Sequence, residues 1–132
     1  SPPKPINKKI RKTRHINNLR EKRMPKYLIR VSMTSEGVRG LQKDMASGRR
    51  AAAAKFAESA GGKLEAMYFA FGQDDVVAIA DLPDNAAAVA VSVAAHAVGL
   101  ANYTITPLLT VEEMDKAIEK SHKLVPPGRA TK

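Results

Sequence analysis

The feature that most constrains the fold is a change of hydrophobic period along the chain, from two to about 3.6 and back. Residues 26–34 read KYLIRVSMT, and Tyr27, Ile29, Val31 and Met33 alternate with their neighbours. A period of two predicts a strand with one buried face. The alternation stops at Ser35, so we expect this strand to lead into a helix.

Residues 35–60 carry apolar side chains at helical spacing, which predicts a helix. We expect Ser35 to cap it, because a serine side chain can accept from the first free backbone N–H groups. The spacing breaks at residues 46–48. This break predicts a kink and a second helical piece, capped by Ser47 and ended by the glycines at 61–62.

The remaining elements follow from the same patterns. Residues 63–71 and 75–82 predict two strands joined by a tight turn. Residues 86–98 are alanine-rich and predict a helix. Residues 103–109 predict an edge strand, since they contain a proline, and the sequence TVEE at 110–113 is a capping box that opens a last short helix.

The order β-α-β-β-α-β with a terminal helix predicts an α+β, ferredoxin-like fold, with a four-stranded antiparallel sheet and two helices on one face. Both registers of the second and third strands are largely apolar. A sheet that is apolar on both faces needs cover on both, and the helices cover one. We therefore expect a homo-oligomer formed through the sheet.

Positive charge is concentrated before Met24. The whole chain has a formal net charge of +9, and residues 1–23 hold nine of the 22 basic residues but one of the 13 acidic ones. The remaining domain is close to neutral, and Met24 is the expected original start. The residues of this arm that are expected to contact a polyanion are Lys8, Lys9, Arg11, Lys12, Arg14, Arg20, Lys22 and Arg23.

Four interpretations of the arm stay open: an appended segment, an arm that binds nucleic acid or another polyanion, a segment that docks on a protein partner, and a targeting segment. Because the arm has no aromatic residue, its contacts with nucleic acid would be to phosphates. We expect the arm at 1–23 to be disordered when free, the domain to span 24–125, and 126–132 to form a flexible tail.

Several blocks of the domain resemble one known family. They are residues 24–29 (MPKYLI), 34–41 (TSEGVRGL), 47–50 (SGRR), 61–65 (GGKLE), 71–77 (FGQDDVV) and 106–110 (TPLLT). In this order and spacing they resemble the GYD domain family from residue 24 to about 122. The resemblance implies a ferredoxin-like fold of the dimeric α/β-barrel type and no particular activity. Asp74 stands where the family's name motif has tyrosine.

The sequence offers little catalytic chemistry. It has no cysteine, which excludes disulfides, zinc–thiolate sites and cysteine nucleophiles. Its three histidines lack metal-ligand spacing, and no phosphate-binding loop or nucleophile elbow is present. Asp74 and Asp75 are expected to make turn hydrogen bonds rather than to act as an acid–base pair. We expect no metal, no cofactor and no transmembrane segment, and we expect a cytoplasmic protein.

One cluster of residues could hold a small anion. If the first strand and first helix pack together, several bases near the helix break can converge on a carboxylate or phosphate. The alternative is that these bases are surface charges paired with Glu36, Asp44 and Glu58. His96 is expected to be a core or rim histidine, with a catalytic base or haem ligand as the alternative. The candidate ligand-binding residues are Arg30, Arg39, Arg49, Arg50, Tyr68 and His96, and Ser32 and Lys43 lie near them in the sequence.

The leading functional hypothesis is a self-associating, non-catalytic domain that acts in assembly or binding. Its basic arm would become multivalent in an oligomer and so gain avidity for a polyanion or acidic partner. The alternative is a small-ligand-binding protein or an enzyme of the dimeric α/β-barrel type, with its site between sheet and helices. The sequence leans against an enzyme, since no catalytic residues are predicted.

Overall fold

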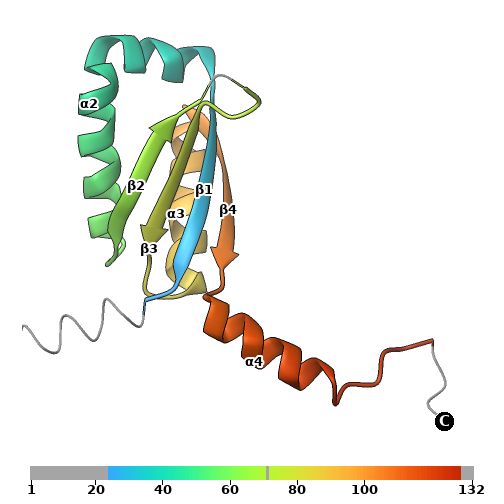
Figure 1. Cartoon of the computed structure of the whole chain (residues 1–132). Coiled ribbons are helices and arrows are strands. Elements are labelled where there is room, and N and C mark those ends of the chain that lie inside the picture. The colour runs from blue at the N-terminus through green and yellow to red at the C-terminus, as the bar shows by residue number, and fades with distance from the viewer. Residues whose placement is uncertain (1–23, 71, 129–132) are drawn as a thin grey trace, which may run out of the picture.

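The computed structural model describes residues 24–70 and 72–128. The sheet has four strands, and Figure 1 shows helices packed on one of its faces. The elements in chain order are β1 (Lys26–Met33), α2 (Ser35–Ser59), β2 (Lys63–Phe69), β3 (Val76–Asp81), α3 (Asn85–Val98), β4 (Ala101–Leu108) and α4 (Val111–Ser121). The strand order is β2-β3-β1-β4, and all three pairings are antiparallel. The predicted ferredoxin-like α+β fold is confirmed.

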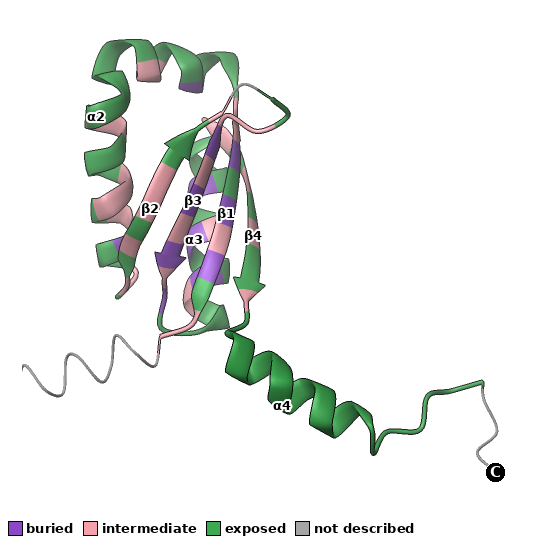
Figure 2. Cartoon of the chain, viewed as in Figure 1, coloured by how far each residue is buried: buried purple, intermediate pink, exposed green. Residues whose placement is uncertain are grey.

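The core is built from the alternating buried residues of the two inner strands, β1 and β3. Tyr27, Ile29 and Val31 of β1 are buried beside Val76 and Ala78 of β3, all on the face that the helices cover. Figure 2 shows that the buried positions concentrate on β1, β3 and α3. The Tyr27 hydroxyl donates to Asn85 Oδ1 at 2.7 Å, which ties the start of α3 to the sheet.

Helix α2 begins one residue earlier than expected, because Thr34 rather than Ser35 is its N-cap. Thr34 Oγ1 accepts from the Gly37 N–H at 3.2 Å and itself donates to the Leu100 carbonyl at 2.9 Å. Thr34 therefore caps the start of the helix and also joins it to the turn before β4. Ser35 lies inside the helix and cannot act as its N-cap.

The predicted kink in α2 is confirmed, but it lies at Met45. This residue has φ 65° and ψ 168°, and it separates two helical pieces that meet at a sharp bend (Figure 1). Ser47 was predicted to cap the second piece. That prediction is wrong, because a cap has non-helical dihedral angles and Ser47 lies within the helix. The second piece then runs beside β2 and ends at Ser59. Ala60 is its C-cap, and Gly61 follows with φ 85°.

Strands β2 and β3 form the predicted hairpin, but their connection is longer than the three-residue turn expected. It spans residues 70–75, because the β2 strand ends at Phe69 and β3 begins at Val76. Asp75 holds this connection to β1: its Oδ2 accepts from the Met33 N–H at 2.7 Å. A register shift between Leu64 and Ala66 marks a bulge in β2.

Strand β4 is at the sheet edge, as its proline predicts. The capping box is also confirmed, since Thr110 and Glu113 exchange side-chain hydrogen bonds of 3.0 and 3.1 Å. The helix that it opens, α4, leads away from the sheet (Figure 1), and each of its residues is exposed (Figure 2). None of the helices in the described residues is long and apolar enough to cross a membrane.

Candidate functional site

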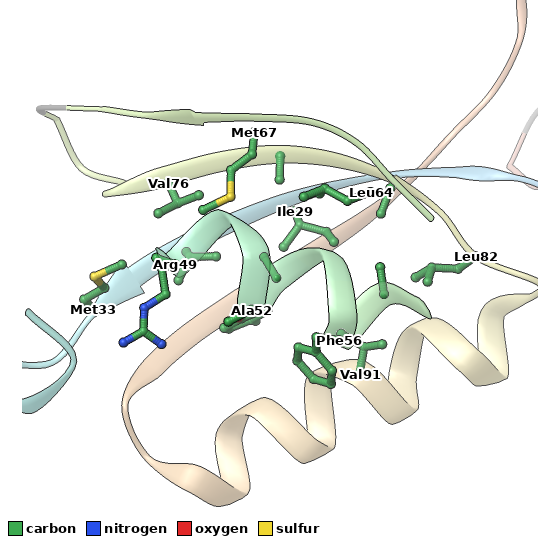
Figure 3. Close-up of a pocket in the computed structure, with 16 residues that line it drawn as sticks. Ile29, Met33, Arg49, Ala52, Phe56, Leu64, Met67, Val76, Leu82 and Val91 are labelled. Atoms are coloured by element: carbon green, nitrogen blue, oxygen red, sulfur yellow. The ribbon is translucent and has the colours of Figure 1, made fainter. Parts of the chain in front are cut away.

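A cavity of about 150 Å³ lies between the sheet and the second piece of α2. Its floor is the buried face of the sheet, with Ile29 and Val31 of β1 at the centre. Ala52 and Phe56 of α2 and Val91 of α3 form the other walls (Figure 3). The walls are apolar almost throughout, so a ligand that fills this space must have an apolar body.

Arg49 is the one charged residue among the described residues that line this cavity. It follows the bend in α2, and its Nη2 lies 3.2 Å from Asp44 Oδ2 on the other side of the bend. Its Nε atom is buried and has no hydrogen-bond partner. Gly40 leaves room for the guanidinium, since a Cβ there would lie 2.8 Å from Nη2. The bend therefore brings a positive charge with an unused donor to an apolar cavity.

Tyr103 of β4 lines the same cavity and a second one of about 170 Å³ that Arg49 also borders. Burial raises the pKa of Tyr103, and the positive charge of Arg49 opposes that shift. The phenol therefore stays protonated at neutral pH and can act as a donor.

His96 has both ring nitrogens occupied by hydrogen bonds. Nδ1 lies 2.7 Å from the Ser92 carbonyl oxygen, which can only accept, so Nδ1 carries the hydrogen. Nε2 accepts from the Tyr103 N–H at 3.2 Å. The ring also packs edge-on against Tyr103, with centroids 6.4 Å apart. His96 thus connects α3 to β4.

The structure separates the other predicted site residues from Arg49. Arg30 lies on the opposite face of the sheet, with its Nη1 3.9 Å from Asp74 Oδ2. Tyr68 is also on that face and is 71% exposed. Arg39 and Arg50 are exposed on α2. Of the expected cluster, only Arg49 therefore borders the cavity, and the basic residues of the arm at 1–23 lie outside the described residues.

The sheet face opposite the cavity, which we call the open face, has no helix of the described residues over it (Figure 1). Strand register places Leu28 of β1, Val77 and Ile79 of β3 and Tyr68 of β2 there. Its β4 side is polar, with residues 102, 104 and 106 being Asn, Thr and Thr. An apolar band thus crosses three strands of the open face.

One end of the open face carries a charged group of three residues. Lys26 Nζ donates to Glu65 at 2.8 Å and to Asp81 at 2.9 Å. These hydrogen bonds, first to Glu65 and then to Asp81, raise the pKa of Lys26. The group is partly exposed, and it fixes the start of β1 against β2 and β3.

A second apolar surface lies on α4. Val111, Met114 and Ile118 recur at helical spacing and are 75%, 49% and 44% exposed. The open face and α4 are thus two apolar surfaces without a partner in the described part of the chain.

The sequence interpretation missed Tyr103, which lines the cavity, and Gly40, which leaves room for the Arg49 guanidinium. Tyr103 lies two residues before the inward-facing Ile105, and the period of two could have placed both on the buried face. Gly40 gives no sequence signal, because its contact with Arg49 depends on the angle of the bend. Among the described residues, no three His, Asp or Glu side chains gather as a metal site would need.

Comparison with known proteins gives one match. The family model described as the GYD domain matches residues 27–118. No curated protein and no solved structure matches the chain.

Proposed function

The chain belongs to the GYD domain family, and we propose that it is a self-associating, non-catalytic binding domain of the cytoplasm, paired with a second copy through the open face of its sheet. The observation that carries the proposal is the apolar band on that face. Leu28, Val77 and Ile79 are central to the sheet and lie on the side that no described helix covers. Contact with water is unfavourable for such a band, and a partner surface would remove it.

A second copy is the partner that this face fits best. A two-fold axis through the face would set each apolar band against its own equivalent, which satisfies both copies at once. The four strands have 6–8 residues, so the face measures roughly 20–26 Å by about 19 Å. That is about 450 Å², less than the roughly 800 Å² per partner of a standard interface.

Helix α4 can supply the missing area. It has 11 residues, and a helix of that length is marginal in water without tertiary contacts. Two residues separate it from β4, whose Leu108 lies on the open face in register with Lys26. We propose that the interface extends from the open face onto the apolar stripe of α4, so that one partner covers both surfaces.

The proposal is tested by measuring the mass of the full chain in solution by sedimentation or light scattering over micromolar concentrations. We expect a dimer or larger oligomer. Ile79→Lys places a charge in the centre of the band and should give monomers. The matched control is Val93→Lys, because Val93 is 63% exposed on α3, away from this face. A monomeric unsubstituted chain, or equal effects of the two substitutions, would overturn the proposal.

The basic arm adds a second part to the proposed function. Residues 1–23 carry nearly all of the net charge of the chain, so an oligomer would present several arms and gain avidity for nucleic acid or another polyanion. Binding to a nucleic acid should weaken steeply with salt and should fall when residues 1–23 are deleted. Equal binding by the full and shortened chains at low salt would exclude this role.

A small-ligand-binding role is the second candidate function. The observation that favours it is the apolar cavity with the unpartnered Nε of Arg49 at its edge.

A further inference from the structure

We infer that the cavity bordered by Arg49 and Tyr103 binds a compact monocarboxylate, with an apolar body about the size of one six-membered ring and its carboxylate against the guanidinium. This inference concerns the helix-covered face of the sheet. It therefore stands independently of pairing through the open face.

The volume of the cavity sets the size of the ligand. At about 150 Å³ it has the volume of an apolar cavity that accepts benzene. Ile29, Phe56 and Val91 offer only carbon to a ligand. A ring or short branched chain gains the transfer free energy of its apolar surface there, whereas a sugar or nucleotide would lose hydrogen bonds to water.

Arg49 sets the charge of the ligand. A buried N–H without a partner is unfavourable, and the Nε of Arg49 is in that state. A carboxylate matches the planar fork of a guanidinium better than any neutral group. No acidic residue lines the cavity among the described residues, so an anion would meet no repulsion from its walls.

The position of Arg49 sets the orientation of the ligand. The Arg49 side chain is 27% exposed, so part of the guanidinium reaches solvent at the edge of the cavity, while its Nε is buried. The ligand carboxylate would lie at this edge and keep part of its hydration, and the apolar body would point toward the sheet. Tyr103, which stays protonated, can donate a second hydrogen bond.

Asp44 acts as an internal competitor for the same guanidinium. Its Oδ2 is 3.2 Å from Arg49 Nη2, and its side chain is 46% exposed. An exposed ion pair of this kind contributes little stability, so a ligand carboxylate can share or replace it at small cost. Removing the charge of Asp44 should therefore strengthen ligand binding, a result that a purely structural role of Arg49 does not predict.

The test titrates the full ¹⁵N-labelled chain with benzoate and, as neutral probe of the same shape, benzyl alcohol, and follows the backbone amide signals. We expect benzoate to shift signals around Arg49, Ala53 and Tyr103 in the millimolar range, and to bind about tenfold or more tightly than benzyl alcohol. Arg49→Met should weaken benzoate binding at least about tenfold, the scale of one charge-assisted hydrogen bond. Asp44→Asn should strengthen it.

Two controls keep the result decisive. Arg50→Met removes an exposed charge next in sequence and should leave benzoate binding unchanged. Ala53→Leu retains Arg49 and fills the cavity, so it should abolish binding even if Arg49→Met fails to fold. The inference is overturned if benzoate shifts no signal near the cavity, if benzyl alcohol binds equally well, or if Arg50→Met weakens binding as much as Arg49→Met.

Discussion

Two glycines of α2 should respond in opposite directions to the same substitution. A Cβ at Gly37 would overlap the Leu100 carbonyl oxygen and lie 3.2 Å from its carbon and 3.4 Å from Met33 Cβ. A Cβ at Gly48 would meet only Asp44 Cβ, at an ordinary 3.4 Å. Alanine should therefore destabilise the protein at position 37 and stabilise it at position 48.

The loss of stability expected for Gly37→Ala follows from the contacts of the Leu100 carbonyl, which must move. The Leu100 carbonyl accepts from Thr34 N at 3.0 Å and from Thr34 Oγ1 at 2.9 Å. Moving it weakens two hydrogen bonds, about 1 kcal/mol each, and overpacking adds about 1–3 kcal/mol. The higher helix propensity of alanine than of glycine offsets up to about 1 kcal/mol of this loss. The net loss should be about 2–4 kcal/mol, or roughly 10–25 °C in Tm.

The assay is urea unfolding of both variants beside the unsubstituted chain, with the oligomeric state checked at the same concentration. Gly48→Ala should raise the free energy of unfolding by about 0.5–1 kcal/mol, because it removes only unfolded-state freedom. Equal changes in the two variants would show that Gly37 has no close contact with Leu100 at the junction between α2 and β4.

Three further predictions concern the sheet and the bend. Tyr27→Phe removes the hydrogen bond to Asn85 and should cost about 1 kcal/mol in urea unfolding, and an unchanged midpoint would count against that bond. Lys26→Met should cost less than about 1 kcal/mol, since the group is partly exposed. The pKa of Lys26 is raised in the folded protein. The loss of stability on Lys26→Met should therefore be present below about pH 10.5 and vanish as the pH rises through the folded pKa. A loss that persists in strong base would contradict the ion pairing. Met45→Gly relieves a positive φ and should raise the free energy of unfolding by about 1 kcal/mol. A lower free energy of unfolding would argue against strain at the bend.

The sequence predicts the elements of this fold well because each has a strong local signal. The alternation around Tyr27, the capping box at Thr110 and the break near Met45 are confirmed because short-range sterics and hydrogen bonds determine them. The predicted cap at Ser35 is wrong by one residue, since Thr34 and Ser35 offer similar local caps and the contact of Thr34 with Leu100 decides between them. The predicted cap at Ser47 is wrong because the non-helical residue of the bend is Met45, two residues earlier.

The candidate site was harder to predict because it depends on which face each side chain occupies. The bulge near Glu65 shifts the alternation of β2 by one residue, so Tyr68 points to the open face while Met67 borders the cavity. Arg30 is outward because its neighbours Ile29 and Val31 are inward. Of the predicted site residues, only Arg49 lines the cavity. Its position depends on the angle between the two pieces of α2, which is a tertiary property.

The shortness of the side chains on α2 has a consequence for how this cavity could be altered. Ala52, Ala53 and Ala57 line it, and an alanine methyl has no rotamer to adjust. The helix backbone therefore sets the width of the space directly, and each larger residue at position 53 would narrow it by a fixed step. A series from alanine through valine to leucine would act as a graded filter for ligand size on an unchanged sheet, and the same three positions are where selectivity could be evolved or engineered without touching the charge of Arg49.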